Sequence, residues 1–383
     1  MNLSARFFTS ISDIPRDHWQ QLFKNHSLFI QYQYLLSLEQ SQCVSADTGW
    51  IANHLIIYDQ ETPIAGLPLY VKMHSYGEYM FDWNWAAAYQ QRQMEYYPKL
   101  LSAIPFTPVS GTRLAFAENT KLSRNLIIET LIEVLKQRLD AFDASNFQCL
   151  FIDKDSSDEL EQYQVVQRND VLFQWFNQDY KTFDDFLGKL TARKRKSIKK
   201  ERKVLSQQQL KYQWIENAEI TPTHWQLFYQ CYRQTYLKRS GHQGYLNLQF
   251  FQSLSENLAE NCRLLMVSKD GQTIASALFF EHAGTLYGRY WGALAQIPGL
   301  HFEVCYYQGI EYCIEHGLQK FDAGVQGEHK LNRGFVPVLS YGNYLLAESP
   351  FKAAIEDVIK RENNHYRHLL DSGALDTAYR KED

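Results

Sequence analysis

Two stretches of this 383-residue sequence repeat one pattern, and this repeat constrains the fold more than any other feature. The first begins at His54 and reads HLIIYDQETPIAGLPLYV; the second begins at Arg263 and reads RLLMVSKDGQTIASALFF. Each has an apolar segment, a polar turn and a second apolar segment, which is the pattern of a β-hairpin. The turn Asp270-Gly271 is a strong hairpin signal. The repeat predicts that one α/β unit is duplicated, which gives two domains.

An aromatic segment follows each hairpin, and we interpret it as a third strand. Phe81 and Trp85 correspond in spacing to Tyr287 and Trp291. We therefore predict a strand over 78–86 and a helix over 91–103 in the first half. The predicted fold class is α/β (α+β), with two tandem domains, each a mixed and mostly antiparallel sheet flanked by helices. We expect the N-terminal domain at 1–176 and the C-terminal domain, which carries the donor site, at 177–383.

The bulk composition indicates an ordinary globular protein. Hydrophobic residues make up 45% and charged residues 21% of the chain, both common values. No apolar run approaches the ~20 residues that a membrane span needs, and the N-terminal segment has no signal-peptide pattern. Six cysteines without a C-x-x-C pair argue against a zinc site or a disulfide framework. We expect a cytoplasmic protein with no transmembrane segment and no metal site.

A cluster of basic residues lies early in the second half. The segment RKRKSIKKERK, from Arg193 to Lys203, holds eight basic residues and one acid, although the whole chain has a net charge of −4. A capping-box pattern at Thr182-Phe-Asp-Asp185 predicts a helix that runs from there through the cluster to about Ser206. The residues of this basic patch are Arg193, Lys194, Arg195, Lys196, Lys199 and Lys200. Three interpretations stay open: a site for a phosphorylated donor or acceptor such as tRNA, a membrane-surface patch, and a solvated helix without a ligand.

A short loop precedes a predicted helix at 301–316. Unpaired N–H groups and the helix dipole favour anions at a helix N-terminus. We therefore predict that Gln296, Gly299 and Leu300 bind the phosphate of a donor. His301 and Glu303 follow directly, so they are candidates for positioning the acceptor or sharing the role of base. The alternative is an ordinary helix whose polar face meets solvent.

The loop GVQGEHKLNRGF, at 324–335, is dense in functional groups and follows a predicted strand. Ligands bind at the carboxyl ends of strands in α/β sheets. Acylation of an amine needs a base to accept its proton and donors to stabilise an oxyanion. Glu328 or His329 is the candidate base, and Lys330 and Arg333 are candidates for contacting phosphate or carboxylate. A polar surface turn is the alternative interpretation.

Several segments together carry a resemblance to a known family. They are PFTPVSGTRL (105–114), KLTARKRKSIKKER (189–202), LYGRYWG (286–292), LHFEVCYYQGIEYCIE (300–315) and FDAGVQGEHKLNRGF (321–335). In this order they resemble the FemAB-like family of N-acyltransferases, relatives of the Fem peptidoglycan aminoacyltransferases in the GNAT superfamily. The resemblance implies two tandem GNAT-like folds, and an acyl-CoA or an aminoacyl-tRNA as co-substrate. However, the junction ALAQIPGL lacks the Q/R-x-x-G-x-G/A pyrophosphate loop of ordinary acetyltransferases.

The resulting hypothesis is an N-acyltransferase that moves an acyl or aminoacyl group from a phosphate-containing donor to an amine by direct transfer. Its partners would be a small-molecule donor, an amine acceptor and, as a further candidate, tRNA; no tightly bound cofactor is expected. The alternative is a non-catalytic GNAT-like module that recognises a cell-wall precursor or RNA through the basic helix. A dedicated nucleic-acid binder fits less well, because the remainder of the chain is acidic.

Overall fold

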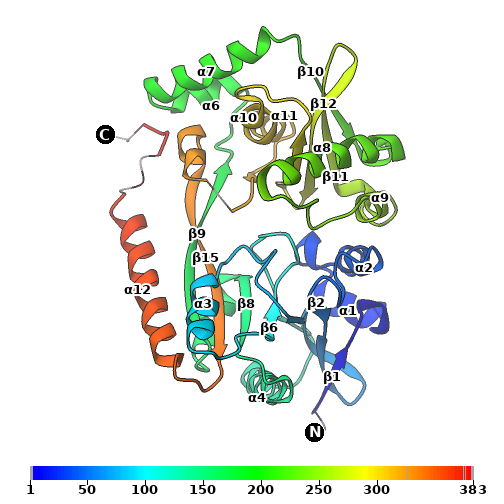
Figure 1. The fold of residues 1–383 in the computed structure, drawn as a ribbon, viewed down its shortest axis with the longest axis vertical. Helices are drawn as coiled ribbons and strands as arrows, with labels where there is room; N and C mark the ends of the chain where they lie inside the picture. Colours follow the sequence, from blue (N-terminus) through cyan, green and yellow to red (C-terminus); the bar gives the residue numbers. More distant parts are fainter. Residues whose placement is uncertain (1–2, 326, 374, 376, 381–383) are drawn as a thin grey trace. The chain divides into compact units, whose positions relative to one another are not determined.

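The computed structural model describes residues 3–325, 327–373, 375 and 377–380 (Figure 1). The chain forms two compact units: residues 1–171 with 339–368, and residues 172–338 with 369–383. The boundary between the units therefore falls inside two strands, β9 (Val166–Phe176) and β15 (Val336–Leu346). The first unit is therefore built from two separate parts of the chain, 1–171 and 339–368. The sequence predicted a single boundary, at residue 176.

The first unit contains two sets of paired strands. One set follows the order β1 (Leu3–Phe8), β3 (His54–Asp59), β4 (Thr62–Leu67) and β7 (Ala115–Phe116). The other joins β2 (Trp50–Ala52), β5 (Tyr70–Lys72), β6 (Lys99–Ser102), β8 (Asn146–Ile152) and β15. All pairs are antiparallel except β6 with β8, which is parallel. The unit is therefore a mixed, mostly antiparallel arrangement.

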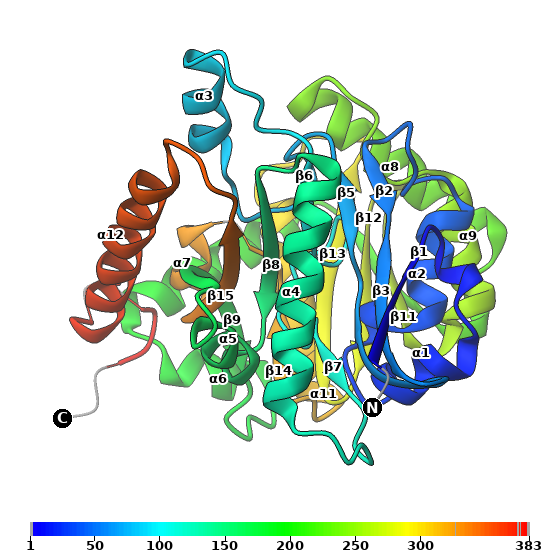
Figure 2. The same ribbon diagram turned by 90° about the horizontal axis from the view of Figure 1, so that it is seen from below.

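Helices cover the strands of the first unit. They are α1 (Arg16–Phe23), α2 (Tyr32–Gln40), α3 (Trp83–Gln91), α4 (Arg124–Phe142), α5 (Lys154–Glu161) and most of α12 (Lys352–Asp371). The long helix α4 lies along the strands in Figure 2. Its apolar residues recur at helical spacing, including Ile128, Leu131 and Leu135, and they pack in one core with strand residues such as Leu55 and Leu100. The apolar face of the amphipathic helix α4 therefore packs against the strands and forms a core with them.

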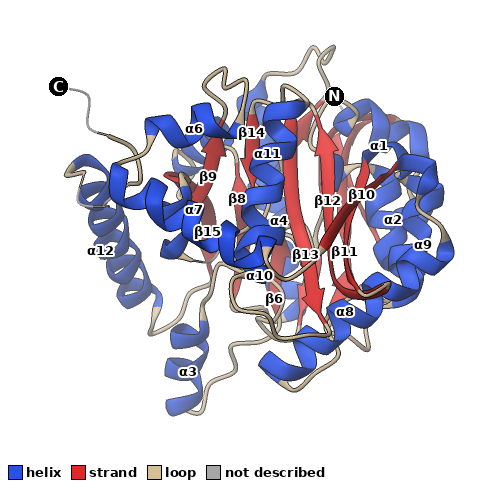
Figure 3. Cartoon of the chain, turned by 90° about the horizontal axis from the view of Figure 1, so that it is seen from above, coloured by secondary structure: helices blue, strands red, loops and turns tan. Residues whose placement is uncertain are grey.

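The second unit is built around an antiparallel meander with a parallel strand added. Its strands follow the order β10 (Lys211–Glu216), β11 (Cys262–Lys269), β12 (Gln272–His282), β13 (Thr285–Ala293), β14 (Lys320–Asp322) and β9. Its helices include α6 (Phe183–Lys189), α7 (Ala192–Ser206), α8 (Pro222–Ser240), α9 (Leu248–Asn257) and a helix at 300–315 that joins β13 to β14. Figure 3 shows these helices around the red strands. Only β13 with β14 is parallel, because a helical crossover connects these two strands.

Strand β13 is covered by different helices on its two faces. Tyr290 meets Tyr232 of α8, with ring centroids 6.0 Å apart, whereas the ring of Trp291 lies 4.6 Å from that of His301. Successive side chains of a strand point to opposite faces. Helix α8 and the helix at 300–315 therefore pack on opposite sides of β13.

The duplicated hairpins are present in both units. Strands β3 and β4 form one antiparallel pair, and β11 and β12 form the other. Each pair has a register shift, between Ile57 and Tyr58 in the first and between Val267 and Ser268 in the second. These positions correspond in the repeat. The predicted class of mixed sheets flanked by helices is thus confirmed.

Three predicted elements of the sequence differ from the structure. The segment 78–86 is not a third strand, because helix α3 begins at Trp83, and the predicted helix at 91–103 contains β6 instead. Three consecutive alanines in α3 favour a helix intrinsically, whereas the aromatic residues around them have the alternation of a strand. The predicted helix from Thr182 is broken at Leu190, which has an extended backbone and bridges to Tyr379. Pairing of Leu190 with Tyr379, which is distant in the sequence, thus separates α6 from α7.

We expect Gly292→Ala to destabilise the protein strongly. A Cβ at this position of β13 would lie 1.9 Å from the carbonyl oxygen of Cys231 in α8, so the helix must move. We predict a loss of about 3 kcal/mol in the free energy of unfolding, measured by urea denaturation. Gly188→Ala in α6 is the control: nothing lies within 4 Å of its added Cβ, so this change should be neutral or stabilising by about 0.5–1 kcal/mol. Equal stability of the two variants would contradict the packing described.

Candidate active site

The pairing of β13 with β14 ends early. Only Thr285–Tyr287 and Lys320–Asp322 are in register, and β13 continues to Ala293 after β14 has ended. A cavity of about 80 Å³ lies at this point. Its lining comes from β12, β13, the following helix and the end of β14: Ala277, Leu278, Phe279, Gly288, Arg289, Tyr290, Trp291, His301, Cys305, Tyr306 and Ala323. The opening is therefore a narrow slot whose wall combines apolar side chains with polar ones, among them His301 and Tyr306.

A β-bulge in β13 places a cation at this opening. In the register with β12, Phe279 is opposite Gly288 and Leu278 is opposite Tyr290, so Arg289 is the extra residue. Its Nη1 donates to the Asp322 carboxylate and to the Asp322 carbonyl, each at 3.0 Å. Asp322 is buried, and burial raises its pKa. The charge and hydrogen bond of Arg289 and the backbone N–H of Gly324 together lower the pKa by more, so the net shift is downward. The ion pair thus connects the middle of β13 to the end of β14.

The helix that joins the strands begins with an unusual turn. Gly299 precedes it in a left-handed conformation, with φ of 84°, which glycine adopts without steric cost. The helix then runs as α10 (Leu300–Phe302), a π-helical segment (Glu303–Tyr307) and α11 (Gln308–Glu315). Single π-helical turns are frequent at functional sites. Of the three residues predicted to bind phosphate, Gln296 is exposed, Gly299 is partly exposed and Leu300 is buried.

A histidine–tyrosine pair links this helix to the loop after β14. The Tyr306 hydroxyl and Nε2 of His329 are 2.9 Å apart, and the ring centroids of His301 and His329 are 6.5 Å apart. Gly327 makes room for this arrangement, because its φ is 114° and an added Cβ would lie 2.2 Å from the His329 ring. The structure therefore brings the predicted residues His301 and His329 together. Glu328 is exposed.

The two histidines differ in their electrostatic surroundings. Burial lowers the pKa of His301 to about 3, and nearby positive charges add to this effect. Partial desolvation lowers the pKa of His329, followed by the charges of Arg333 and Lys330. Both rings are thus neutral at pH 7. A neutral imidazole can accept a proton or donate a hydrogen bond, and the environment makes His301 the weaker base.

Lys330 and Arg333 hold the loop in place. Lys330 is 1% exposed, and its Nζ donates to the carbonyls of Ala323 and Gly324 at 2.9 and 2.5 Å. Burial lowers the pKa of Lys330 to about 8 despite the attraction of Asp322. Arg333 donates to the His329 carbonyl at 2.9 Å, pairs with Glu201 at 3.1 Å and lies over the Phe302 ring. Both cations, predicted from the sequence to contact phosphate or carboxylate, therefore bond to groups of the protein.

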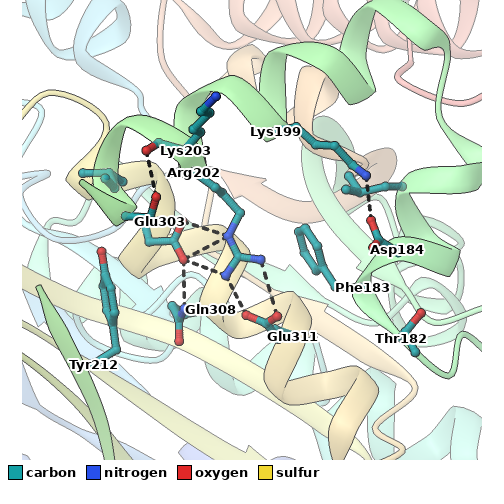
Figure 4. A pocket seen from close by; sticks show the side chains of 13 residues that line it. Thr182, Phe183, Asp184, Lys199, Arg202, Lys203, Tyr212, Glu303, Gln308 and Glu311 are labelled. Carbon is teal, nitrogen blue, oxygen red and sulfur yellow. Dashed lines mark hydrogen bonds and ion pairs between the residues drawn. The ribbon is translucent and has the colours of Figure 1, made fainter. Parts of the chain in front are cut away.

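A second and larger cavity lies beside helix α7 (Figure 4). Its volume is about 760 Å³, within the usual range of ligand sites. Glu303 lines this cavity, whereas His301 lines the small one. Arg202 donates to Glu303 at 2.9 Å and to Glu311 at 2.7 Å, and Gln308 also donates to Glu303. Residues two apart on a helix do not face each other, so the structure does not bring Glu303 together with His301.

The basic patch divides into partnered and outward-facing residues. Lys199 pairs with Asp184 at 2.9 Å, and Lys194 donates to Asn332. Arg193, Lys196 and Lys200 are exposed, and Arg195 is partly exposed. Beside the cavity, Lys199 and Arg202 are thus paired with carboxylates, while Arg193, Lys196 and Lys200 present their positive charge to solvent.

Sequence reasoning missed several residues of the site. They are Tyr306 and the pair Glu201 and Tyr307, which share a hydrogen bond of 2.5 Å. In the sequence, the two tyrosines lie in a largely apolar helical segment, and Glu201 is the single acid of the basic cluster. Among the residues that the structure describes, no group of three or more His, Cys, Asp and Glu side chains is arranged to hold a metal ion.

The comparison with protein families decides the classification. A family model named FemAB-like, described as peptidoglycan biosynthesis/recognition, matches residues 10–381. The chain belongs to the FemAB-like family. This membership confirms the prediction of an acyltransferase at the level of the class. A search of curated proteins finds no match.

Solved structures confirm the fold of this FemAB-like chain. FemX is 13% identical, with a TM-score of 0.51, and the alignment covers 93% of this chain and all of FemX. A conserved protein of unknown function from Bacteroides thetaiotaomicron is 12% identical, with a TM-score of 0.51, and the alignment covers 90% of this chain and 100% of that protein. A tandem GNAT protein of clavulanic acid biosynthesis is 9% identical, with a TM-score of 0.50, and the alignment covers 91% of this chain and 99% of that protein. The predicted tandem GNAT-like architecture is thus confirmed.

No helix in the described part of the chain is long and apolar enough to span a membrane.

We expect Arg202→Met to destabilise the second unit. Glu303 is 4% exposed at its side chain, so removal of its cation leaves a buried carboxylate unpaired. Breaking such a pair costs about 3 kcal/mol, to be measured by urea denaturation. The control is Lys199→Met, which breaks an exposed pair with Asp184 and should cost about 1 kcal/mol or less. Adding Glu303→Gln to Arg202→Met should recover part of the lost free energy of unfolding, because the buried carboxylate is then removed. If no stability is recovered, the unpaired carboxylate of Glu303 is not the cause of the destabilisation.

Proposed function

We propose that the FemAB-like protein acylates an amine at the opening between β13 and β14. The observation that supports this proposal is the position of two neutral histidines near the point where the strands separate. His301 and Tyr306 lie in the wall of the narrow cavity, and His329 lies beside them, within hydrogen-bond distance of Tyr306. Ligands of α/β sheets bind beyond the carboxyl ends of strands. The cavity of about 80 Å³ is large enough for the acyl end of a donor rather than for the whole donor.

In the proposed reaction the amine nitrogen attacks the acyl carbonyl carbon of the bound donor. The C–N bond forms, the bond from carbon to the sulfur or oxygen of the donor breaks, and the leaving group departs with a proton. His329 accepts the proton that the amine loses, through the ring nitrogen that is not bonded to Tyr306. His301 stays neutral because of its low pKa, and its ring N–H donates a hydrogen bond to the developing oxyanion.

The donor is an acyl-CoA or an aminoacyl-tRNA, and the two make different demands on the protein. A nucleic-acid donor requires phosphate contacts along an extended surface, for which the exposed side of α7 offers Arg193, Lys196 and Lys200. An acyl-CoA requires a compact phosphate site, for which the backbone near Gly299 is the candidate.

Ligand-induced thermal shift with a panel of acyl-CoAs and charged tRNAs tests the donor. A stabilising ligand raises the melting temperature in proportion to its binding free energy. Arg193→Gln, Lys196→Gln and Lys200→Gln together should abolish the shift by tRNA and leave a shift by acyl-CoA intact. Stabilisation without turnover on any donor would favour the non-catalytic recognition module instead.

We expect His329→Asn to lower kcat by about 100-fold to 10,000-fold, the usual contribution of a general base. The pKa of His329 lies below 6.5, so the neutral, active form persists as pH falls to that value. The kcat/KM of the wild type should therefore decline only below about pH 6.5, and the variant should lack this decline. His301→Asn is the control, which should reduce kcat without moving the decline. An unchanged pH profile in His329→Asn would overturn the assignment of the base.

A further inference from the structure

The loop that carries His329 contains one short helical turn, Glu328–Arg333, between two glycines. Gly327 has a φ of 114° and Gly334 a φ of 85°, so both adopt a backbone that is open to glycine without steric cost. The buried Lys330 fixes the first part of the turn through its bonds to two backbone carbonyls. The position of His329 therefore also depends on what holds the other end, at Gly334.

A tyrosine that is distant in the sequence holds this other end. The hydroxyl of Tyr379 donates to the carbonyl of Gly334 at 2.9 Å. Burial raises the pKa of this hydroxyl, so it stays protonated and remains a donor at every working pH. Phe186 of α6 closes another side, since a Cβ at Gly334 would lie 2.6 Å from its ring. Gly334 is thus enclosed by a hydrogen-bond donor and an aromatic ring.

Backbone pairing holds the segment to which this tyrosine belongs. We call residues 377–380 the strap. Tyr379 forms an antiparallel bridge with Leu190, the residue at which α6 and α7 separate. Two backbone hydrogen bonds, of 2.9 and 3.1 Å, flank this bridge, and Ala378 is completely buried. The strap is therefore fixed between α6 and α7 by its backbone, which leaves the Tyr379 hydroxyl for the loop.

Helix α7 holds the same loop at two further points. Lys194 donates to Asn332, and Glu201 pairs with Arg333 at 3.1 Å. Because α7 begins two residues after the bridge at Leu190, the strap also fixes the start of this helix. The strap thus acts on the loop directly, through one hydroxyl, and a second time through α7.

We propose that Tyr379 is a positioning residue for the acyl transfer, and that the strap keeps the ring of His329 beside Tyr306. This inference rests on the proposed function, in which His329 is the base. A base must lie within hydrogen-bond reach of the proton that it accepts, and a small misplacement of a catalytic group lowers the rate strongly. Tyr379 is not among the residues that line the slot, so its effect runs through Gly334 and the loop.

An NMR titration of the histidine side chains of the full chain tests the position of His329 without any donor. Its signal is assigned by its loss in His329→Asn. Partial desolvation, followed by the charges of Arg333 and Lys330, lowers the pKa of His329 in the wild type. Tyr379→Phe should loosen the loop and hydrate the ring, so we expect the pKa of His329 to rise toward about 6.5. An unchanged pKa in this variant would overturn the proposal.

The control removes another buried tyrosine hydroxyl of the second unit. Tyr312 is 2% exposed; its hydroxyl accepts from Arg263 at 2.8 Å and donates to Glu281 at 3.1 Å, and neither partner belongs to the loop. Tyr312→Phe should lower the melting temperature and leave the pKa of His329 unchanged. If it raises that pKa as Tyr379→Phe does, the cause is a general loss of stability and the proposal is wrong.

A second pair of variants moves the strap and leaves its hydroxyl in place. Ala378→Leu overpacks a completely buried position and should raise the pKa of His329 as Tyr379→Phe does. Ala192→Leu adds the same side chain at an exposed position of α7 and should not. The double variant of Ala378→Leu and Tyr379→Phe should match the stronger single variant, because both act through one contact. Additive effects would overturn the role of the hydroxyl.

Turnover of a donor identified by the thermal-shift panel separates this inference from the proposed function. We expect Tyr379→Phe to lower kcat about threefold to tenfold, the effect of one ordinary hydrogen bond, with KM unchanged, and Tyr312→Phe to keep the kcat of the wild type. If His329→Asn abolishes turnover and Tyr379→Phe has the kcat of the wild type, this inference fails and the proposed function stands. Full turnover in His329→Asn would refute the base and, with it, this role of Tyr379.

Discussion

The parallel pairing of β13 with β14 is the constraint on which the second unit depends. A parallel pair needs a crossover, and here the crossover is the helix at 300–315. This helix and α8 cover opposite faces of β13, so Gly292 must remain without a side chain where Cys231 approaches. Because β14 ends at Asp322, the strands separate at the point where the helix begins. The slot, the π-helical turn and the loop carrying His329 therefore all meet at one edge of the sheet.

Charged groups around this edge serve mainly to fix its geometry. Arg289 bonds to Asp322, Arg202 bonds to Glu303, and Lys330 bonds to two backbone carbonyls. Buried charges of this kind are tolerated when each is paired. Two neutral imidazoles remain, His301 in the wall of the slot and His329 beside it. A neutral imidazole is suited to proton transfer.

Local sequence patterns predicted the hairpins, the Thr182–Asp185 capping box and the helix after β13, because each depends on residues close in sequence. They failed over 78–103, where an aromatic alternation suggested a strand and the chain forms α3 and then β6. They also grouped His301 with Glu303, although the helix directs these side chains into different cavities. Predicting the contact of Tyr306 with His329 required knowledge of how the loop folds back, which no spacing encodes.

The sequence by itself determined the family, the tandem α/β architecture and the segments that hold the polar residues, because hydrophobic periodicity and motif order are local properties. Tertiary structure alone decided which of those residues meet. It buried Lys330 against carbonyls, directed Glu303 to Arg202 and brought His329 to Tyr306. It also stacked the ring of Tyr89 in α3 on that of Phe351, more than 260 residues away in the chain. The reason is physical: pKa values and cavities depend on burial and on neighbours distant in sequence.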